Sequence, residues 1–163
     1  MSLAVRDATG ADAPAIAAIY HPIVTGTAIS FETEPPDQAT MAARIDAARK
    51  THAFLVAVAD GVVGYAYGSA YRPRAAYATT AETTVYVAAD ARGKGVGAAL
   101  YGALLPRLSA RGFGQAVAGI TLPNPPSIAL HVAFGFHRAG VLTAVGKKFD
   151  VFHDVALYQR ALS

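Results

Sequence analysis

Residues 82–110 constrain the fold more than any other part of the chain. They open with an alternating run of β-branched and aromatic residues, 83–87, which predicts a strand packed on at least one face. A glycine-rich loop follows at 92–97. Apolar residues then recur at helical spacing, at Val96, Leu100, Leu104 and Leu108. The sequence therefore predicts a strand, a glycine-rich loop and a helix in succession.

This arrangement is typical of an anion-binding site. The first backbone N–H groups of a helix have no intrahelical partner, and the helix dipole also favours negative charge there. Glycines at alternate positions let the backbone approach an anion closely, and Arg92 and Lys94 add positive charge at the rim. We expect a pyrophosphate group to bind here.

The spacing of the loop excludes two common nucleotide-binding motifs. A Rossmann fingerprint requires a third glycine where this chain has Leu100, and the phosphate loop of nucleotide hydrolases requires Ser or Thr after its lysine, where Gly95 stands. The pattern that fits, Arg-x-x-Gly-x-Gly-Ala, resembles the acetyl-coenzyme A loop of the GNAT acetyltransferases. The resemblance implies that acetyl-CoA is bound by Arg92, Gly93, Lys94, Gly95, Val96, Gly97 and Ala98.

The composition is that of a folded globular chain. Its 163 residues are 53% hydrophobic and 15% charged, so we expect one domain, residues 1–163, with a full core. With no cysteine, the chain has no disulfide, thiolate ligand or cysteine nucleophile. The net charge of +3 is too small and diffuse to indicate nucleic acid as a partner.

We also expect no membrane partner and a cytoplasmic location. The N-terminus lacks a charged and then apolar signal pattern. The most apolar stretch, 53–70, is interrupted by Asp60, Gly61 and Gly64. It therefore predicts a hairpin and not a membrane span.

The remaining pattern predicts strands and helices on both sides of this central stretch. Before it we expect a strand at 3–6, helices at 7–25 and 37–50, and hairpin strands at 53–59 and 62–71. After it we expect strands at 115–121, 137–145 and 149–161, with a helix capped by Asn124 between the first two. Pro22 is expected to end or kink the first helix, and Pro106 to kink the central one. The expected class is α/β (α+β), a mixed central sheet flanked by helices.

Five motifs in order resemble the phosphinothricin N-acetyltransferase family of the GNAT superfamily. They lie at 31–35, 81–87, 122–124, 130–136 and 152–155. The resemblance implies the GNAT fold, no metal, and commonly a homodimer. It also implies transfer of an acetyl group from acetyl-CoA to the α-amine of a small amino-acid-like acceptor, such as phosphinothricin, methionine sulfoximine or methionine sulfone. The chain departs from the family pattern at Tyr20, Pro125 and Phe152.

Glu82 and His131 are the candidate catalytic residues. An ammonium acceptor must lose a proton before it attacks a thioester, and Glu82 stands at the start of the strand beside the cofactor loop. Desolvation in a cleft would raise the pKa of this carboxyl, although a strand-end carboxylate can also simply face water. The family resemblance makes Glu82 the base. It also implies that His131 polarises the thioester or stabilises the oxyanion, whereas spacing alone fits an ordinary core histidine equally well.

Further candidates concern the acceptor and the cofactor arm. Arg72 and Arg74 either grip an acidic group of the acceptor or form a solvated basic turn. Main-chain groups of the central strand are expected to pair with the pantetheine arm as an added strand would. The candidates are Phe31, Arg72, Arg74 and Tyr77 for the acceptor, and Val85, Tyr86, Val87 and Asn124 for the cofactor. His153 and Asp154 are expected to form a structural hydrogen-bonded pair, and no cluster has metal-ligand spacing.

Two alternatives remain open at this point. The first is a GNAT enzyme for another amine, such as a polyamine, an aminoglycoside or a protein N-terminus, against which the basic turn at Arg72 and Arg74 argues. The second is a catalytically silent acyl-CoA-binding domain, which would keep the glycine loop without needing Glu82. Wide separation of Glu82 and His131, or a cleft without an acceptor pocket, would favour the silent domain. For an enzyme without cysteine we expect direct transfer in a ternary complex.

Overall fold

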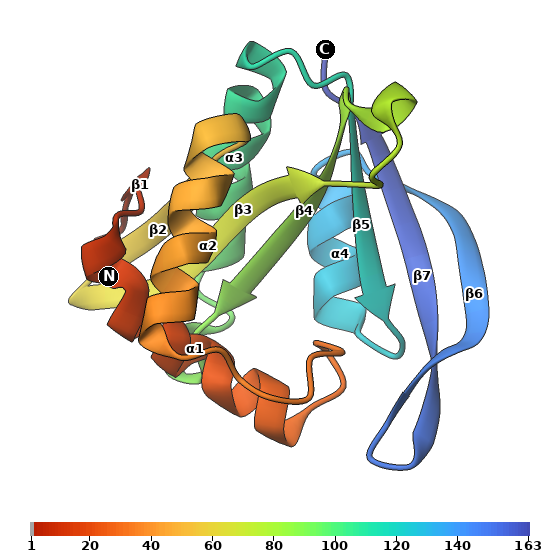
Figure 1. Ribbon diagram of the computed structural model, residues 1–163, viewed down its shortest axis with the longest axis horizontal. Coiled ribbons are helices and arrows are strands. Elements are labelled where there is room, and N and C mark those ends of the chain that lie inside the picture. Colours follow the sequence, from red (N-terminus) through yellow and green to blue (C-terminus); the bar gives the residue numbers. More distant parts are fainter. Residues whose placement is uncertain (1) are drawn as a thin grey trace.

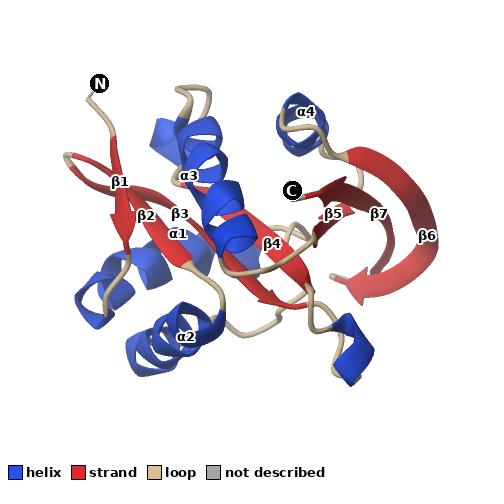
Figure 2. Ribbon diagram, turned by 90° about the horizontal axis from the view of Figure 1, so that it is seen from above, coloured by secondary structure: helices blue, strands red, loops and turns tan. Residues whose placement is uncertain are grey.

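The computed structural model describes residues 2–163 and contains a mixed seven-stranded sheet with helices on both faces (Figures 1 and 2). The strand order is β1-β2-β3-β4-β5-β7-β6. The strands are β1 (Ala4–Asp7), β2 (Phe54–Ala59), β3 (Gly61–Ala70), β4 (Thr80–Val87), β5 (Gln115–Thr121), β6 (His137–Lys148) and β7 (Val151–Ala161). The helices are α1 (Ala13–Gly26), α2 (Gln38–Thr51), α3 (Val96–Ala110) and α4 (Pro125–Ala133), with short 3₁₀ turns η1 (Gly10–Asp12), η2 (Ala75–Tyr77) and η3 (Ala89–Ala91).

The expected fold class and the order of elements are confirmed. The boundaries differ mainly at α1, at β4, which begins at Thr80 and so includes Glu82, and at β6, which continues to Lys148. Helix α1 begins at Ala13 and not at Asp7, because a strand end and a 3₁₀ turn precede it, and it continues past Pro22 to Gly26. Helix α3 likewise runs through Pro106 to Ala110. Within residues 2–163, no helix combines the length and the apolar character that a bilayer span requires.

Strands β4 and β5 form the one parallel pair among the described strands, and they soon separate. Their ladder joins only residues 80–82 to residues 115–117. Beyond it β4 continues to Val87 and β5 to Thr121, so the two strands diverge (Figure 1). The edge of β4 after Glu82 therefore has a strand neighbour on the β3 side only.

The direction of the β4 main-chain groups follows from the hydrogen bonds to β3. The Ala88 N–H donates to the Val63 carbonyl, and the β3–β4 register is continuous from Val87 back to Ala81. Main-chain groups alternate between the two sides of a strand. The groups of Thr84 and Tyr86 therefore point to β3, and those of Thr83, Val85 and Val87 point into the opening.

Helices α3 and α4 cover one face of the sheet and α1 and α2 the other (Figure 2), and each face has its own core. On one face α3 and α4 pack through Leu100, Leu104 and Leu130, while on the other α1 and α2 pack through Ile16 and Ile45. Side chains of β4 alternate between the faces. Val85 thus packs with the α3 core and Tyr86 with the α1–α2 core, so Glu82 also faces α1 and α2.

Two glycines in β3 let α3 lie close to the sheet. A Cβ atom added to Gly64 would lie 2.9 Å from Val96 Cγ1 and 3.1 Å from the Tyr86 carbonyl oxygen. One added to Gly68 would lie 2.8 Å from a methyl group of Leu108. Glycine at these two positions therefore sets the distance between α3 and β3.

Substituting glycine should have opposite effects at Gly64, inside this interface, and at Gly102, on the exposed side of α3. Gly64→Val should destabilise the protein by about 2 kcal/mol, because overpacking displaces α3 from β3. Gly102→Ala should stabilise it by about 1 kcal/mol, because this glycine lies on the exposed side of α3 with nothing near its Cβ position. Urea unfolding measures both free energies. A Gly64→Val protein as stable as the wild type would contradict the close packing described.

Candidate active site

A cleft of about 430 Å³ occupies the opening between β4 and β5. This volume lies within the range of small-molecule sites. Its walls come from both faces of the sheet, because α4 contributes residues on one side, and α1, α2 and the loop at 27–37 contribute on the other. Its lining includes Tyr20, Phe31, Glu32, Arg44, Glu82, Val85, Tyr86, Tyr101, Thr121, Asn124, His131 and Val155.

Glu82 lies where the opening begins. It is the last β4 residue that pairs with β5, and its half-buried carboxyl lines the cleft. Burial raises the pKa of this carboxyl above its ordinary value, and the positive charge of Arg72 opposes the shift. A carboxyl with a raised pKa is better matched to accepting a proton near neutral pH than an ordinary one.

His131 lines the same cleft from α4, but neither ring nitrogen is free. Nδ1 lies 2.6 Å from the Ser127 carbonyl oxygen, and Nε2 lies 2.8 Å from the Tyr101 hydroxyl. A carbonyl only accepts, so Nδ1 carries the proton of the neutral ring and Nε2 accepts from Tyr101. Burial lowers the pKa of His131, which favours this neutral form. The Tyr101 hydroxyl also lies 3.1 Å from Thr83 Oγ1, which completes a buried chain between α4 and β4.

The glycine loop has the geometry of an anion site. Gly93 and Gly95 have φ angles of 74° and 81°, in the left-handed region that glycine adopts without strain. Gly95 is the N-cap of α3 and offers no side chain to the first turn, so the N–H groups of Val96, Gly97 and Ala98 have no intrahelical partner. These free donors at the N-terminus of α3 fit the pyrophosphate of acetyl-CoA.

Other residues proposed for the cofactor have structural contacts as well. Arg92 donates to the Val87 carbonyl at 3.2 Å, and Lys94 to the Asp90 carbonyl at 3.0 Å. Asn124 Oδ1 accepts from the Ser127 N–H at 3.3 Å and so caps α4, while the residue also lines the cleft. A Cβ at Gly97 would lie 3.1 Å from Leu130 Cδ2, so this glycine also permits close packing of α3 on α4.

The loop at 27–37 closes the other side of the cleft and is fastened to the β6–β7 hairpin. Lys148 is buried and donates to the Val24 and Ser30 carbonyls, each at 2.7 Å. Phe31 lines the cleft, and its ring fills the space beside Gly146 where any side chain would collide. The Phe31 ring centroid lies 6.2 Å from that of His153.

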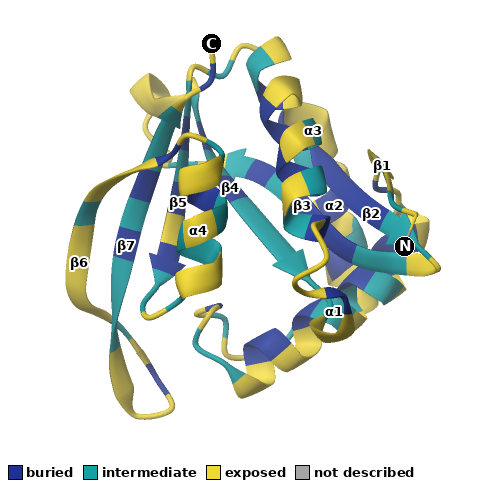
Figure 3. Cartoon of the chain, turned by 180° about the vertical axis from the view of Figure 1, so that it is seen from behind, coloured by how far each residue is buried: buried dark blue, intermediate teal, exposed yellow. Residues whose placement is uncertain are grey.

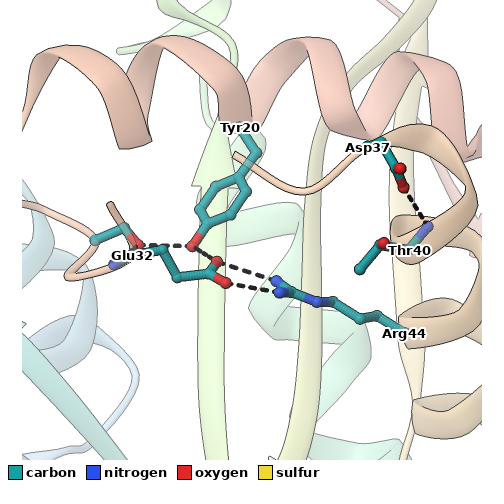
Figure 4. A network of polar contacts seen from close by, with 6 residues as sticks. Tyr20, Glu32, Asp37, Thr40 and Arg44 are labelled. Carbon is teal, nitrogen blue, oxygen red and sulfur yellow. Dashed lines mark hydrogen bonds and ion pairs between the residues drawn. The ribbon is translucent and has the colours of Figure 1, made fainter. Parts of the chain in front are cut away.

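A charged network, which the sequence did not reveal, lies beside this loop (Figure 4). Arg44 donates two hydrogen bonds to Glu32, at 3.0 and 2.6 Å, and the Tyr20 hydroxyl donates to the same carboxylate. Arg44 holds the pKa of Glu32 below its usual range. Glu32 belongs to a recognised motif, but nothing in the pattern of α2 singles out Arg44, because the two residues meet only through tertiary packing.

Arg72, Arg74 and Tyr77 do not line the cleft. They lie exposed in the β3–β4 turn, where the Arg72 guanidinium stacks over Tyr71 at 4.9 Å and Tyr77 meets the same ring edge-on. This turn joins β3 to the N-terminal end of β4, where β4 still pairs with β5. The opening begins after Glu82, toward the C-terminal end of β4 (Figure 1). The structure therefore does not bring these residues to Phe31, and only the charge of Arg72 acts on Glu82.

The prediction of a hydrogen bond between His153 and Asp154 is wrong. Asp154 accepts instead from the Ala144 N–H at 2.7 Å, which fastens the β6–β7 hairpin. Of the positions that depart from the family pattern, Tyr20 lines the cleft, Pro125 begins α4, and Phe152 is 63% exposed. Within residues 2–163, no group of three His, Cys, Asp or Glu side chains is placed to hold a metal ion.

Comparison with known sequences identifies relatives over nearly the whole chain. The model of the acetyltransferase (GNAT) family matches residues 18–136. The phosphinothricin N-acetyltransferase of Alcaligenes faecalis is 46% identical over 166 residues, which cover 98% of this chain and 82% of the relative. The L-methionine sulfoximine/L-methionine sulfone acetyltransferase of Pseudomonas aeruginosa is 40% identical over 162 residues, covering 98% and 94%.

Solved structures share the whole fold. The phosphinothricin acetyltransferase of Sinorhizobium meliloti, solved in complex with AcCoA, superposes with a TM-score of 0.95 at 40% identity, covering 100% of this chain and 90% of that one. An N-acetyltransferase from Staphylococcus aureus Mu50 superposes with a TM-score of 0.95 at 35% identity, covering 100% of both chains. The free helix N-terminus, the open strand edge and these matches agree: the chain is an acetyl-CoA-dependent N-acetyltransferase and belongs to the GNAT acetyltransferase family.

Proposed function

We propose that the protein transfers the acetyl group of acetyl-CoA to the α-amine of a small amino-acid-like acceptor of the phosphinothricin, methionine sulfoximine or methionine sulfone type. The observation that carries the proposal is the position of Glu82, a carboxyl with a raised pKa in the cleft that adjoins the open edge of β4. Relatives named for these acceptors are 40–46% identical to this chain. The acceptor class rests on those relatives, because Arg72 and Arg74 lie outside the cleft lining.

In this proposal the cofactor lies along the divergence of β4 and β5. The N–H groups of Val96, Gly97 and Ala98 hold the pyrophosphate, and the main-chain groups of Val85 and Val87 pair with the pantetheine arm as a neighbouring strand would. The acetyl group then reaches the cleft where Glu82 and Tyr101 approach from opposite faces of β4. The acceptor enters from the side of α1, α2 and the loop at 27–37.

The reaction proceeds by direct transfer. Glu82 takes a proton from the acceptor ammonium, and the free amine attacks the thioester carbonyl carbon. The carbonyl oxygen becomes an oxyanion and the amine nitrogen becomes positively charged. The C–S bond then breaks, the nitrogen loses its second proton to the leaving thiolate, and coenzyme A departs as a thiol. Glu32 is held ionised by Arg44 and Tyr20, which leaves Glu82 as the cleft carboxyl with the pKa suited to a base.

His131 acts as a neutral positioning residue in this mechanism. With its proton on Nδ1, it has no donor to offer the oxyanion from Nε2. The Tyr101 hydroxyl, which His131 and Thr83 hold at the cleft, is the available donor, because it can exchange its bond to Nε2 for one to the oxyanion. The stabilisation of the oxyanion that family resemblance assigned to His131 is thus provided by Tyr101, which His131 positions.

Glu82→Gln should lower kcat by roughly 10²–10⁴-fold while acetyl-CoA affinity stays unchanged, because the amide keeps the shape of the side chain and removes the base. Wild-type activity should fall as the pH drops through the raised pKa of Glu82, since only the carboxylate accepts a proton. The variant should lose this acidic limb. Steady-state kinetics between pH 5 and 9 checks both effects, with the exposed Glu34→Gln as control. A Glu82→Gln enzyme with wild-type kcat throughout would place the base elsewhere.

Tyr101→Phe should lower kcat by roughly 10²-fold with little change in the acceptor KM, because it removes an oxyanion donor and keeps the buried ring. Tyr158→Phe is the matched control, since Tyr158 is also buried near His131 but is absent from the cleft lining. Steady-state kinetics, followed by the release of coenzyme A as a free thiol, measures both variants. Equal activity of the two variants would remove Tyr101 from the mechanism.

We also propose that residues 1–163 form one acetyltransferase domain that works as a homodimer. Support comes from the β6–β7 hairpin, in which β6 is largely exposed (Figure 3) and which carries apolar side chains without a covering element. These are Val141, Leu142, Val145, Phe149, Val151 and Phe152, each more than 40% exposed.

Phe152→Asp should convert the dimer to a monomer, because a charge would be placed in the apolar contact. Sedimentation velocity of wild-type and variant protein measures this change. A wild-type protein that sediments as a monomer at micromolar concentration would contradict the proposal.

A further inference from the structure

His153 has a buried ring nitrogen that forms no hydrogen bond with the rest of the described structure. Its Nε2 is fully buried, and among the side chains of residues 2–163 it is the one buried nitrogen or oxygen without a hydrogen-bond partner. A buried polar atom without a partner reduces the free energy of unfolding, and native proteins contain few such atoms. The neighbouring Asp154 does not relieve it, since its carboxylate accepts from Ala144.

The position of His153 connects it to the acceptor side of the cleft. Alternate residues of a strand share a face, so His153 faces the same way as Val155, which lines the cleft beside Thr121. Opposite His153 on β6 lies Gly146, and the ring of Phe31 packs over both residues. His153 therefore lies just beyond the cleft wall, beneath Phe31.

Phe31 is suited to act as a movable cover. Its main chain is held by the bond from Lys148 to the neighbouring Ser30 carbonyl, but the residue is 40% exposed and its ring lies against Gly146, which has no side chain. Rotation of this side chain removes the ring from His153 without disturbing the fastened loop. The buried nitrogen would then face the cleft from the side of β7, where Val155 lines it.

We propose that His153 Nε2 donates a hydrogen bond to the distal oxygen of the acceptor, with Phe31 turned aside, when the acceptor amine lies at Glu82. The inference rests on the proposed function and identifies the residue that recognises the far end of the acceptor. Sulfone, sulfoximine and phosphinate groups all present acceptor oxygens, and an imidazole protonated on Nε2 is a matching donor. A thioether offers only a weak acceptor at the same place.

Methionine sulfone and methionine provide the test, because they share one skeleton and differ only in the two sulfone oxygens. The measured quantity is the ratio of kcat/KM for methionine sulfone to that for methionine. His153→Phe should lower this ratio roughly 10-fold or more, because the hydrogen bond is lost for one acceptor only. His153→Gln, which keeps an N–H donor, should retain part of the ratio. The KM for acetyl-CoA should not change in either variant.

His137→Phe is the matched control, since it makes the same substitution at an exposed histidine of β6. It should leave the ratio at the wild-type value. If His153→Phe lowers activity on both acceptors equally, or on neither, the inference is overturned, because a merely structural role acts on both alike. A wild-type enzyme that acetylates neither compound would overturn the proposed acceptor class, and this inference with it. Active wild-type protein with an unchanged ratio would overturn the inference alone.

Discussion

The early separation of β4 from β5 is the constraint on which the site depends. Three residue pairs join the two strands, and β4 then continues with one edge unpaired. Main-chain N–H and C=O groups in a cleft require partners, so an open strand edge favours an extended ligand that supplies them. Glu82 ends the paired segment and lines the cleft, while the glycine loop follows the open one. The same break in the ladder therefore positions the base, the cofactor arm and the helix N-terminus that receives its phosphates.

The two sides of the opening have different electrostatic character. On the α3–α4 side, the chain from His131 through Tyr101 to Thr83 is buried and neutral. On the other side Glu32 and Arg44 form a charged pair in the wall of the cleft, which the half-buried Glu82 also lines. Ion pairing lowers the pKa of one cleft carboxyl and desolvation raises that of the other. This difference separates a structural carboxylate from one suited to take a proton from the acceptor.

The sequence predicted the elements that local pattern controls, and it missed contacts that depend on packing. Periodicity and glycine spacing identified β4, the loop and α3, although β4 begins at Thr80 and so contains Glu82, which the pattern placed at the strand start. Arg44 and Glu32 come from different elements, and Tyr101 and His131 from different helices, so no local signal joins them. Arg72 and Arg74 were expected near the acceptor because they lie close to Glu82 in the chain. Their turn lies at the N-terminal end of β4, whereas the opening lies beside its C-terminal part.

Amide hydrogen exchange along β4 tests the open-edge account most directly. The amides of Val85 and Val87 point into the opening, whereas those of Thr84 and Tyr86 are bonded to β3. Adding acetyl-CoA should slow exchange at Val85 and Val87 strongly and leave Thr84 and Tyr86 almost unchanged, which residue-resolved NMR distinguishes. Protection spread evenly over all four amides, or none at Val85 and Val87, would contradict the claim that the cofactor pairs with the free edge of β4.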